Sequence, residues 1–306
     1  MELEFADMLV KVILAIIMVG VGSTITLAAF KNVFLIPRQL ITGLLLQLIA
    51  LPLIAIVIAE LSGLPAPIKA GIVILAACPG GTTSNFISFI SNAKTSLSIA
   101  LTSVNSILVL FSIPLIAHLA ISYYLGAGSP ISMPVGDTIF TIFFVILLPA
   151  LIGMSIRESH PKIADSIEKP IKYVSVILII ILFSIKFFAE SSIGGSGITP
   201  DIVLQIMPYL LLMHLLSLAM GFFAGVLSGF EGKASITLGI EVGLQNTTLA
   251  LLITSAILDN DMLTYPALVY ALFSFWTTLL FAFGLKRLLS RTDKPFGKIK
   301  DRFIKP

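Results

Sequence analysis

The sequence predicts an all-α polytopic membrane protein with nine transmembrane helices. Hydrophobic residues make up 57% of the 306 residues and charged residues only 11%, about half of the charged share of a soluble domain. The mean hydropathy is +1.07. Apolar runs of roughly 20 residues, long enough to cross a bilayer, recur along the chain. Two of these runs are interrupted by polar, glycine-bearing patches at residues 78–85 and 241–246.

The nine predicted helices follow one another through short loops. They cover about residues 8–29, 38–60, 66–91, 95–122, 136–156, 170–189, 201–228, 233–257 and 262–288. No hydrophilic stretch separates them, so residues 1–306 are expected to form one membrane domain that ends in a basic tail, residues 289–306.

The positive charges predict how the helices are oriented. With a cytoplasmic C-terminus, sixteen of the 19 lysines and arginines fall inside, and only Lys11, Lys69 and Lys186 fall outside. Cytoplasmic loops of membrane proteins carry this excess of positive charge. We therefore expect an inner-membrane protein with an external N-terminus and a cytoplasmic tail. The tail is expected to contact anionic lipid headgroups, and nucleic-acid binding is not expected.

Two stretches of similar length predict an inverted repeat. About 72 residues separate the start of the first helix from Gly80, and about 74 separate the start of the sixth helix near Lys169 from Gly243. Helices 1–4 would pair with helices 6–9 in the opposite orientation, which leaves helix 5 of the second half without a partner. Transporters built in this way hold substrate and ions near the membrane midplane, at broken helices.

Glu241 is the one carboxylate expected deep in an apolar segment. An ionised side chain facing lipid there costs at least about 2.5 kcal/mol, so Glu241 is expected to face the protein interior. No lysine or arginine lies at a matching depth. The carboxyl group is therefore either protonated and hydrogen-bonded, or paired with a bound cation. Oxygens of Gln245, Asn246, Ser84 and Asn85 suit a hard cation such as sodium.

Two hydroxyl residues of the fourth predicted helix are candidate cation ligands. Ser98 and Thr102 stand four residues apart and share a helix face, although such hydroxyls in membrane helices often bond only to their own backbone. Ser84 and Asn85, which lie just past a break, favour a cation site that includes these hydroxyls. The helices that restart after Gly81 and Gly243 have unpaired N–H groups that an anion can approach.

Other chemistry is not indicated. The single Cys78 excludes an intramolecular disulfide and a cysteine-based metal cluster. His118, His160 and His214 are scattered and are interpreted as packing or surface residues. Metalloprotease, phosphate-binding-loop and nucleophile-elbow motifs are missing from the sequence, so an enzyme is not expected.

Four segments resemble the bile acid:sodium symporter family in its bacterial branch: residues 78–85, 97–103, 240–246 and 266–276. The resemblance covers essentially the whole chain. It implies a core domain with two crossing discontinuous helices, a panel domain against which the core moves, two sodium ions as coupling ions and no other cofactor.

The resemblance also implies three sets of residues. One sodium site would use Ser84, Asn85, Ser98, Thr102 and Glu241. The other would use Gln47, Glu241, Gln245 and backbone oxygens of Val242 and Leu244. The substrate cavity would be walled by Thr82, Thr83 and Asn246.

The chain departs from some bacterial relatives in two ways. It has nine predicted helices instead of ten, and Thr277 and Thr278 stand where some relatives have a polar His-Asn pair. The expected function is a monomeric symporter that imports an organic anion, such as a bile acid, a pantoate-like acid or a 2-oxo acid. The alternatives are a proton-coupled carrier, in which Glu241 titrates, and a membrane sensor that binds sodium and an anion without transport.

Overall fold

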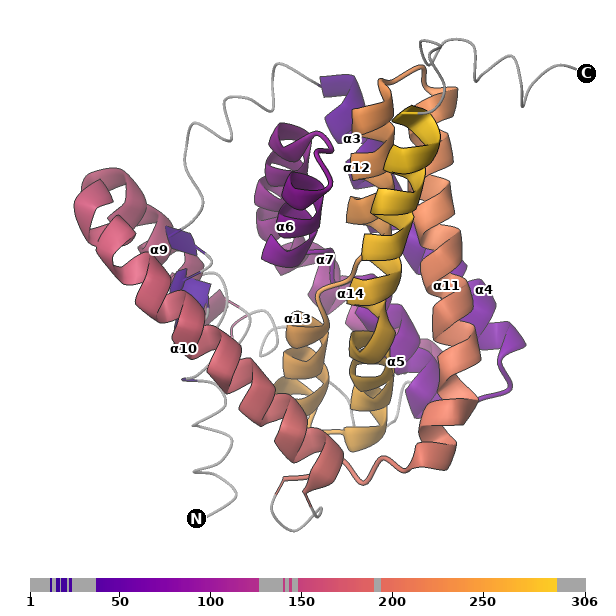
Figure 1. Ribbon diagram of the computed structural model, residues 1–306. Helices are drawn as coiled ribbons and strands as arrows, with labels where there is room; N and C mark the ends of the chain where they lie inside the picture. Colours follow the sequence, from indigo (N-terminus) through magenta and orange to yellow (C-terminus); the bar gives the residue numbers. More distant parts are fainter. Residues whose placement is uncertain are drawn as a thin grey trace, which may run out of the picture.

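The computed structural model describes residues 37–126, 148–189 and 194–290, with isolated residues between 12 and 23 and between 140 and 144. All regular elements in this part are helices (Figure 1), which confirms the all-α prediction for the described residues. They are α3 (Pro37–Leu45), η1 (Leu46–Ala50), α4 (Leu51–Leu61), α5 (Ala66–Ala76), α6 (Thr82–Ile90), α7 (Thr95–Leu125), α9 (Leu148–Ser159), α10 (Pro161–Phe188), α11 (Pro200–Leu227), α12 (Gly232–Gly243), α13 (Thr247–Leu252), η4 (Ile253–Ile257) and α14 (Asp261–Ser290).

Three helices of the described part are long and apolar enough to cross a membrane by themselves. They cover Pro37–Leu61, Pro200–Leu227 and Asp261–Leu288, and the bent helix α7 is a fourth span when its two halves are counted together. The count of nine spans stays a prediction, because most of residues 8–29 and 136–147 lie outside the described residues.

Two spans deviate from regular helix near an internal proline. The first span contains the π-helical turn η1, and Pro52, two residues after its end, cannot donate a hydrogen bond to the carbonyl of Leu48. In α7, the halves Thr95–Val109 and Phe111–Leu125 are bent by 59° relative to each other. Pro114 lies one turn after this bend and leaves the carbonyl at position 110 without its usual partner.

Helices α11 and α12 pack closely against each other. A Cβ atom added at Gly225 of α11 would lie 2.7 Å from the Cα atom of Ser235 in α12, closer than real Cβ atoms approach. Glycine therefore lets the two backbones touch, a packing mode that membrane proteins use because lipid removes the hydrophobic drive for association. Every residue of helix α12 except Lys233 is buried, including Glu241.

Helices α9 and α10 lie at one side of the bundle in Figure 1. An ion pair ties the C-terminal part of α10 to the start of α14, with Lys186 Nζ 3.1 Å from Asp261 Oδ1. The starts of α3 and α12 lie at the same end of the bundle as the end of α14 (Figure 1). Residues Arg38 and Lys233, both predicted to be cytoplasmic, belong to these starts.

One helix begins earlier than the sequence predicted. The hydropathy pattern placed the start of the sixth helix near residue 170, whereas α10 begins at Pro161. Its first turns are rich in charge, including Lys162 and Asp165, so an apolar run cannot reveal them. Proline suits the first turn of a helix, because no N–H partner is required there.

Candidate functional site

The two predicted interruptions meet in space. One separates α5 from α6 and the other separates α12 from α13. Pro79 and Gln245 face each other in an isolated antiparallel bridge, and the amide of Asn246 donates to the carbonyl of Cys78 at 2.9 Å. A Cβ atom at Gly80 would lie 2.5 Å from the Leu244 carbonyl oxygen, so only glycine fits there. The backbone groups that the two interruptions leave outside the helices are thus partly paired with each other.

The Glu241 side chain is fully buried in the last turns of α12. The hydroxyl of Ser98 bonds to one carboxylate oxygen, and the hydroxyl of Thr102 lies 3.4 Å from the other. Both hydroxyls also approach the side-chain oxygen of Asn85, at 2.7 Å from Ser98 and 3.2 Å from Thr102. Among the described residues, no lysine or arginine forms an ion pair with Glu241.

This cluster contains more acceptors than donors. Two hydroxyl protons are shared among three acceptor oxygens, namely the two of Glu241 and the one of Asn85. Ser84, the residue before Asn85 on α6, is also buried. Its hydroxyl donates to the Gly81 carbonyl at 2.8 Å, so the lone pairs of the hydroxyl oxygen stay free to bind a cation. An acceptor-rich group of hydroxyl, amide and carboxylate oxygens is what a hard cation requires.

The second predicted group is brought together in part. Gln47, on the π-helical turn η1, donates from Nε2 to the backbone carbonyl of Glu241 at 2.6 Å. Gln245 donates from Nε2 to the Val242 carbonyl at 2.8 Å, and its own side-chain oxygen is buried without a partner among the described residues. The Leu244 carbonyl faces Gly80. Both lie at the place where the two interruptions meet, which is called the crossing below. Gln47 and Gln245 thus both contact the C-terminal end of α12.

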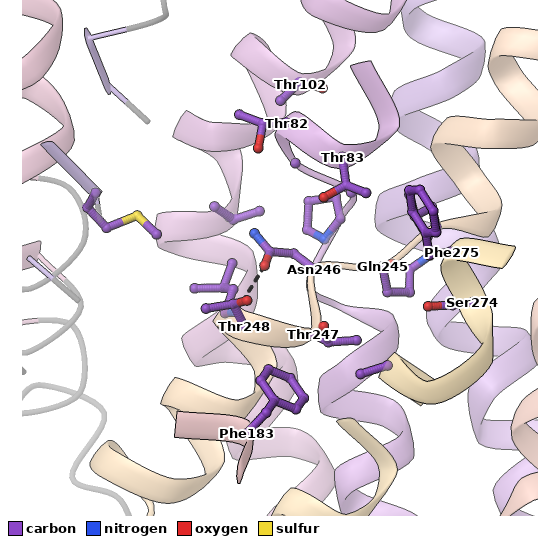
Figure 2. A pocket seen from close by; sticks show the side chains of 18 of the residues that line it. Thr82, Thr83, Thr102, Phe183, Gln245, Asn246, Thr247, Thr248, Ser274 and Phe275 are labelled. Atoms are coloured by element: carbon purple, nitrogen blue, oxygen red, sulfur yellow. Dashed lines mark hydrogen bonds between the residues drawn. The ribbon is translucent and has the colours of Figure 1, made fainter. Parts of the chain in front are cut away.

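A cavity of about 630 Å³ opens beside the crossing. Thr82, Thr83 and Asn246, the three residues predicted for the substrate, all line it. Figure 2 shows them at its centre, with Phe183 of α10 and Phe275 of α14 at its edges. The described residues that line this cavity include no lysine, arginine, histidine, aspartate or glutamate.

The two helix starts at this cavity differ from each other. The side-chain oxygen of Asn246 accepts from the Leu249 amide at 3.0 Å, so Asn246 caps the first turn of α13. Gly81, which precedes α6, has no side chain to cap that helix. The start of α6 therefore lacks the side-chain cap that α13 has, whereas the sequence suggested both starts equally as anion contacts.

Two residues near the crossing were not assigned to the site from the sequence. His214 is buried in α11, with Nδ1 3.0 Å from the Gly243 carbonyl oxygen and 2.7 Å from the Tyr270 hydroxyl. Its Nε2 lies 2.7 Å from the hydroxyl of Thr277. Asn105 donates to the side-chain oxygen of Gln47. The signal for His214 was its place inside an apolar segment, because ionisable residues at membrane depth usually have partners.

Comparison with known proteins identifies the family. The model of the "Sodium Bile acid symporter family" matches residues 11–193. The chain belongs to this family. The "Probable sodium/metabolite cotransporter BASS1, chloroplastic" of Oryza sativa subsp. japonica is 29% identical over 90% of this chain and 65% of its own length. The "Uncharacterized sodium-dependent transporter YocS" of Bacillus subtilis is 28% identical over 88% of this chain and 79% of its own length.

An animal member of the family is also similar. The "Ileal sodium/bile acid cotransporter" of Oryctolagus cuniculus is 25% identical over 96% of this chain and 84% of its own length. Against three plant members, the chain spans 65%, 58% and 61% of their lengths.

Proposed function

We propose that this protein is a sodium-coupled secondary transporter that imports an organic anion. The observation that carries the proposal is the buried, acceptor-rich cluster around Glu241, which has two hydroxyl donors and no cationic side chain among the described residues. A buried carboxylate without a partner is strongly unfavourable. A sodium ion supplies the missing charge and can bind several of these oxygens together. Family membership gives independent support.

Two sodium positions are proposed, each on one side of Glu241. The first uses Ser84, Asn85, Ser98, Thr102 and the Glu241 carboxylate. The second uses Gln47, Gln245, Glu241 and the carbonyls of Val242 and Leu244. The unpartnered side-chain oxygen of Gln245 supports the second position, because a buried acceptor without a donor is rare in native proteins.

The proposed substrate is an anion with an apolar body. The cavity of about 630 Å³ falls within the usual range for small-molecule sites. Its threonine hydroxyls and the start of α6 suit a carboxylate, whereas Phe183, Phe187 and Phe275 suit an apolar group. The relatives named above are called metabolite and bile acid cotransporters. A bile acid, a pantoate-like acid and a 2-oxo acid are the candidates that we propose.

Transport requires the cavity to open to each side in turn. Ile180, Phe183 and Phe187 of α10 form one wall, and the crossing forms another. We propose that α9 and α10 belong to a panel and that the crossing helices belong to a core that moves against it. In this proposal one chain forms the working unit, with inverted repeats, in the inner membrane with its C-terminus in the cytoplasm.

The test is uptake by protein reconstituted in liposomes. Labelled pantoate, pyruvate and cholate are supplied outside with an inward sodium gradient. We expect accumulation that requires sodium and rises with an inside-negative potential, because two sodium ions with one monovalent anion carry net charge. Uptake driven by a pH gradient without sodium would replace the proposal with proton coupling. Binding without accumulation would indicate a sensor.

A further inference from the structure

Asn105 lies between the cavity and the second proposed sodium position. It follows Thr102 by three residues on α7, its side chain is 1% exposed, and it lines the cavity beside the crossing. Its Nδ2 donates to the side-chain oxygen of Gln47. Its Oδ1 is buried and has no hydrogen-bond partner among the described residues. Asn105 thus has one satisfied end and one unsatisfied end.

The hydrogen-bond directions around Asn105 follow from the backbone. The Glu241 carbonyl can only accept, so Gln47 must present its N–H to that carbonyl. The side-chain oxygen of Gln47 therefore faces Asn105, which in turn must present its own N–H group. This chain of bonds leaves the Asn105 oxygen without a donor. A buried acceptor in this state marks a place where the structure is incomplete without a ligand.

We propose that Asn105 couples the cation to the anion by turning its side-chain amide. The inference rests on the proposed function, because it assigns the link between the two ligands of the same site. A cation on the Gln47 oxygen repels the Asn105 N–H group. Half a turn of the amide then offers Oδ1 to the cation and the N–H group to an anion in the cavity. Each ligand thereby stabilises the orientation that favours the other.

Asparagine suits this role for a chemical reason. Its side chain carries a donor and an acceptor on one planar group, so rotation exchanges them at the same place. Leucine has a similar shape and neither group, and aspartate has acceptors only when ionised. The neighbouring Ser106 also lines the cavity, but its hydroxyl donates to the Thr102 carbonyl of its own helix at 2.7 Å. Ser106 is therefore the matched control.

The experiment measures how sodium changes anion affinity. The full chain is purified in detergent, and the apparent Kd of pantoate and of cholate is measured at low and high sodium, with potassium keeping the ionic strength constant. We expect sodium to lower the Kd of the wild type by about 10-fold or more, within the usual range of coupling. For Asn105→Leu and Asn105→Asp we expect a change below about 3-fold. Ser106→Ala should keep the wild-type ratio.

A separate measurement establishes that each variant is folded and binds sodium. The Glu241 cluster does not contain Asn105, so sodium should still raise the melting temperature of both Asn105 variants. Full coupling in Asn105→Leu would overturn the inference and leave the proposed function intact. Loss of the sodium response in both variants would also overturn it, since Asn105 would then be required for sodium binding itself and not for its coupling to the anion. A wild type that ignores sodium and binds neither anion would overturn the proposed function.

Discussion

Replacing Glu241 with glutamine separates the charge of this residue from its shape. In the wild type the carboxylate is fully buried and receives hydroxyl contacts from Ser98 and Thr102. Each hydrogen bond to a charged group contributes about 1.5 to 3 kcal/mol. Burying an unpaired charge costs several kcal/mol. Because these terms oppose each other, Glu241→Gln should lie within about 2 kcal/mol of the wild type in sodium-free buffer.

Sodium should then distinguish the two proteins. A ligand that binds only the folded state stabilises it by about 2.7 kcal/mol at 100 times its Kd. The wild type should gain this amount when potassium is exchanged for sodium at constant ionic strength. Glu241→Gln should gain less than about 0.5 kcal/mol, because its amide supplies no charge and its N–H group can donate to the Asn85 oxygen instead.

The assay is the melting temperature of purified protein in each salt. Glu60→Gln is the matched control, because Glu60 is an exposed residue of α4 whose carboxylate lies 3.9 Å from Lys69 Nζ. This control should respond to sodium as the wild type does. Equal stabilisation of Glu241→Gln and wild type by sodium would refute the role of the Glu241 charge. A wild type that does not respond at all would favour a proton or a structural role.

Three further predictions concern the crossing and its supports. Asn246→Asp keeps the cap on α13, so its free energy of unfolding should lie within about 0.5 kcal/mol of the wild-type value. It should nevertheless lose anion uptake, because it adds negative charge to the cavity. Retained uptake would contradict this. Gly225→Ala should destabilise the protein by about 1 to 3 kcal/mol through overpacking against α12. Gly284 has open space around it, so the control Gly284→Ala should be neutral or up to about 1 kcal/mol more stable in the same melting assay. His214→Leu removes a contact to the Gly243 carbonyl and should lower stability by about 1 to 3 kcal/mol. The hydroxyl of Tyr270 also donates to this carbonyl, and an unchanged melting temperature would show that this bond alone is sufficient.

The interruptions were predictable from sequence because their residue types are rare inside membrane helices. Proline and glycine in residues 79–81, and glycine followed by two amides in residues 243–246, indicate backbone that has left the helix. The matched spacing of the two stretches indicated that they belong together. The structure places them in direct contact through the Pro79–Gln245 bridge. Residue types therefore located the breaks and their shared site.

Side-chain direction was harder to predict than position. The sequence indicated that His214 and Asn105 lie inside apolar helices, but which neighbour each one contacts depends on helix rotation and on which helices pack together. His214 reaches Gly243 because glycines let α11 approach α12 closely. Asn105 reaches Gln47 because η1 places Gln47 between α7 and the Glu241 carbonyl. Such contacts join residues far apart in the sequence and need the fold.

The hydrogen-bond inventory of the crossing favours a metal cation over a proton as the coupling ion. The unsatisfied side-chain atoms that lie there, within the described residues, are the acceptor oxygens of Gln245 and Asn105, and the Glu241 cluster is also short of donors. A proton on Glu241 would add one donor and leave both amide oxygens without a partner. A sodium ion binds several oxygens at once, and amide oxygens are good ligands for it. Proton coupling would thus leave a defect in the buried site that sodium removes.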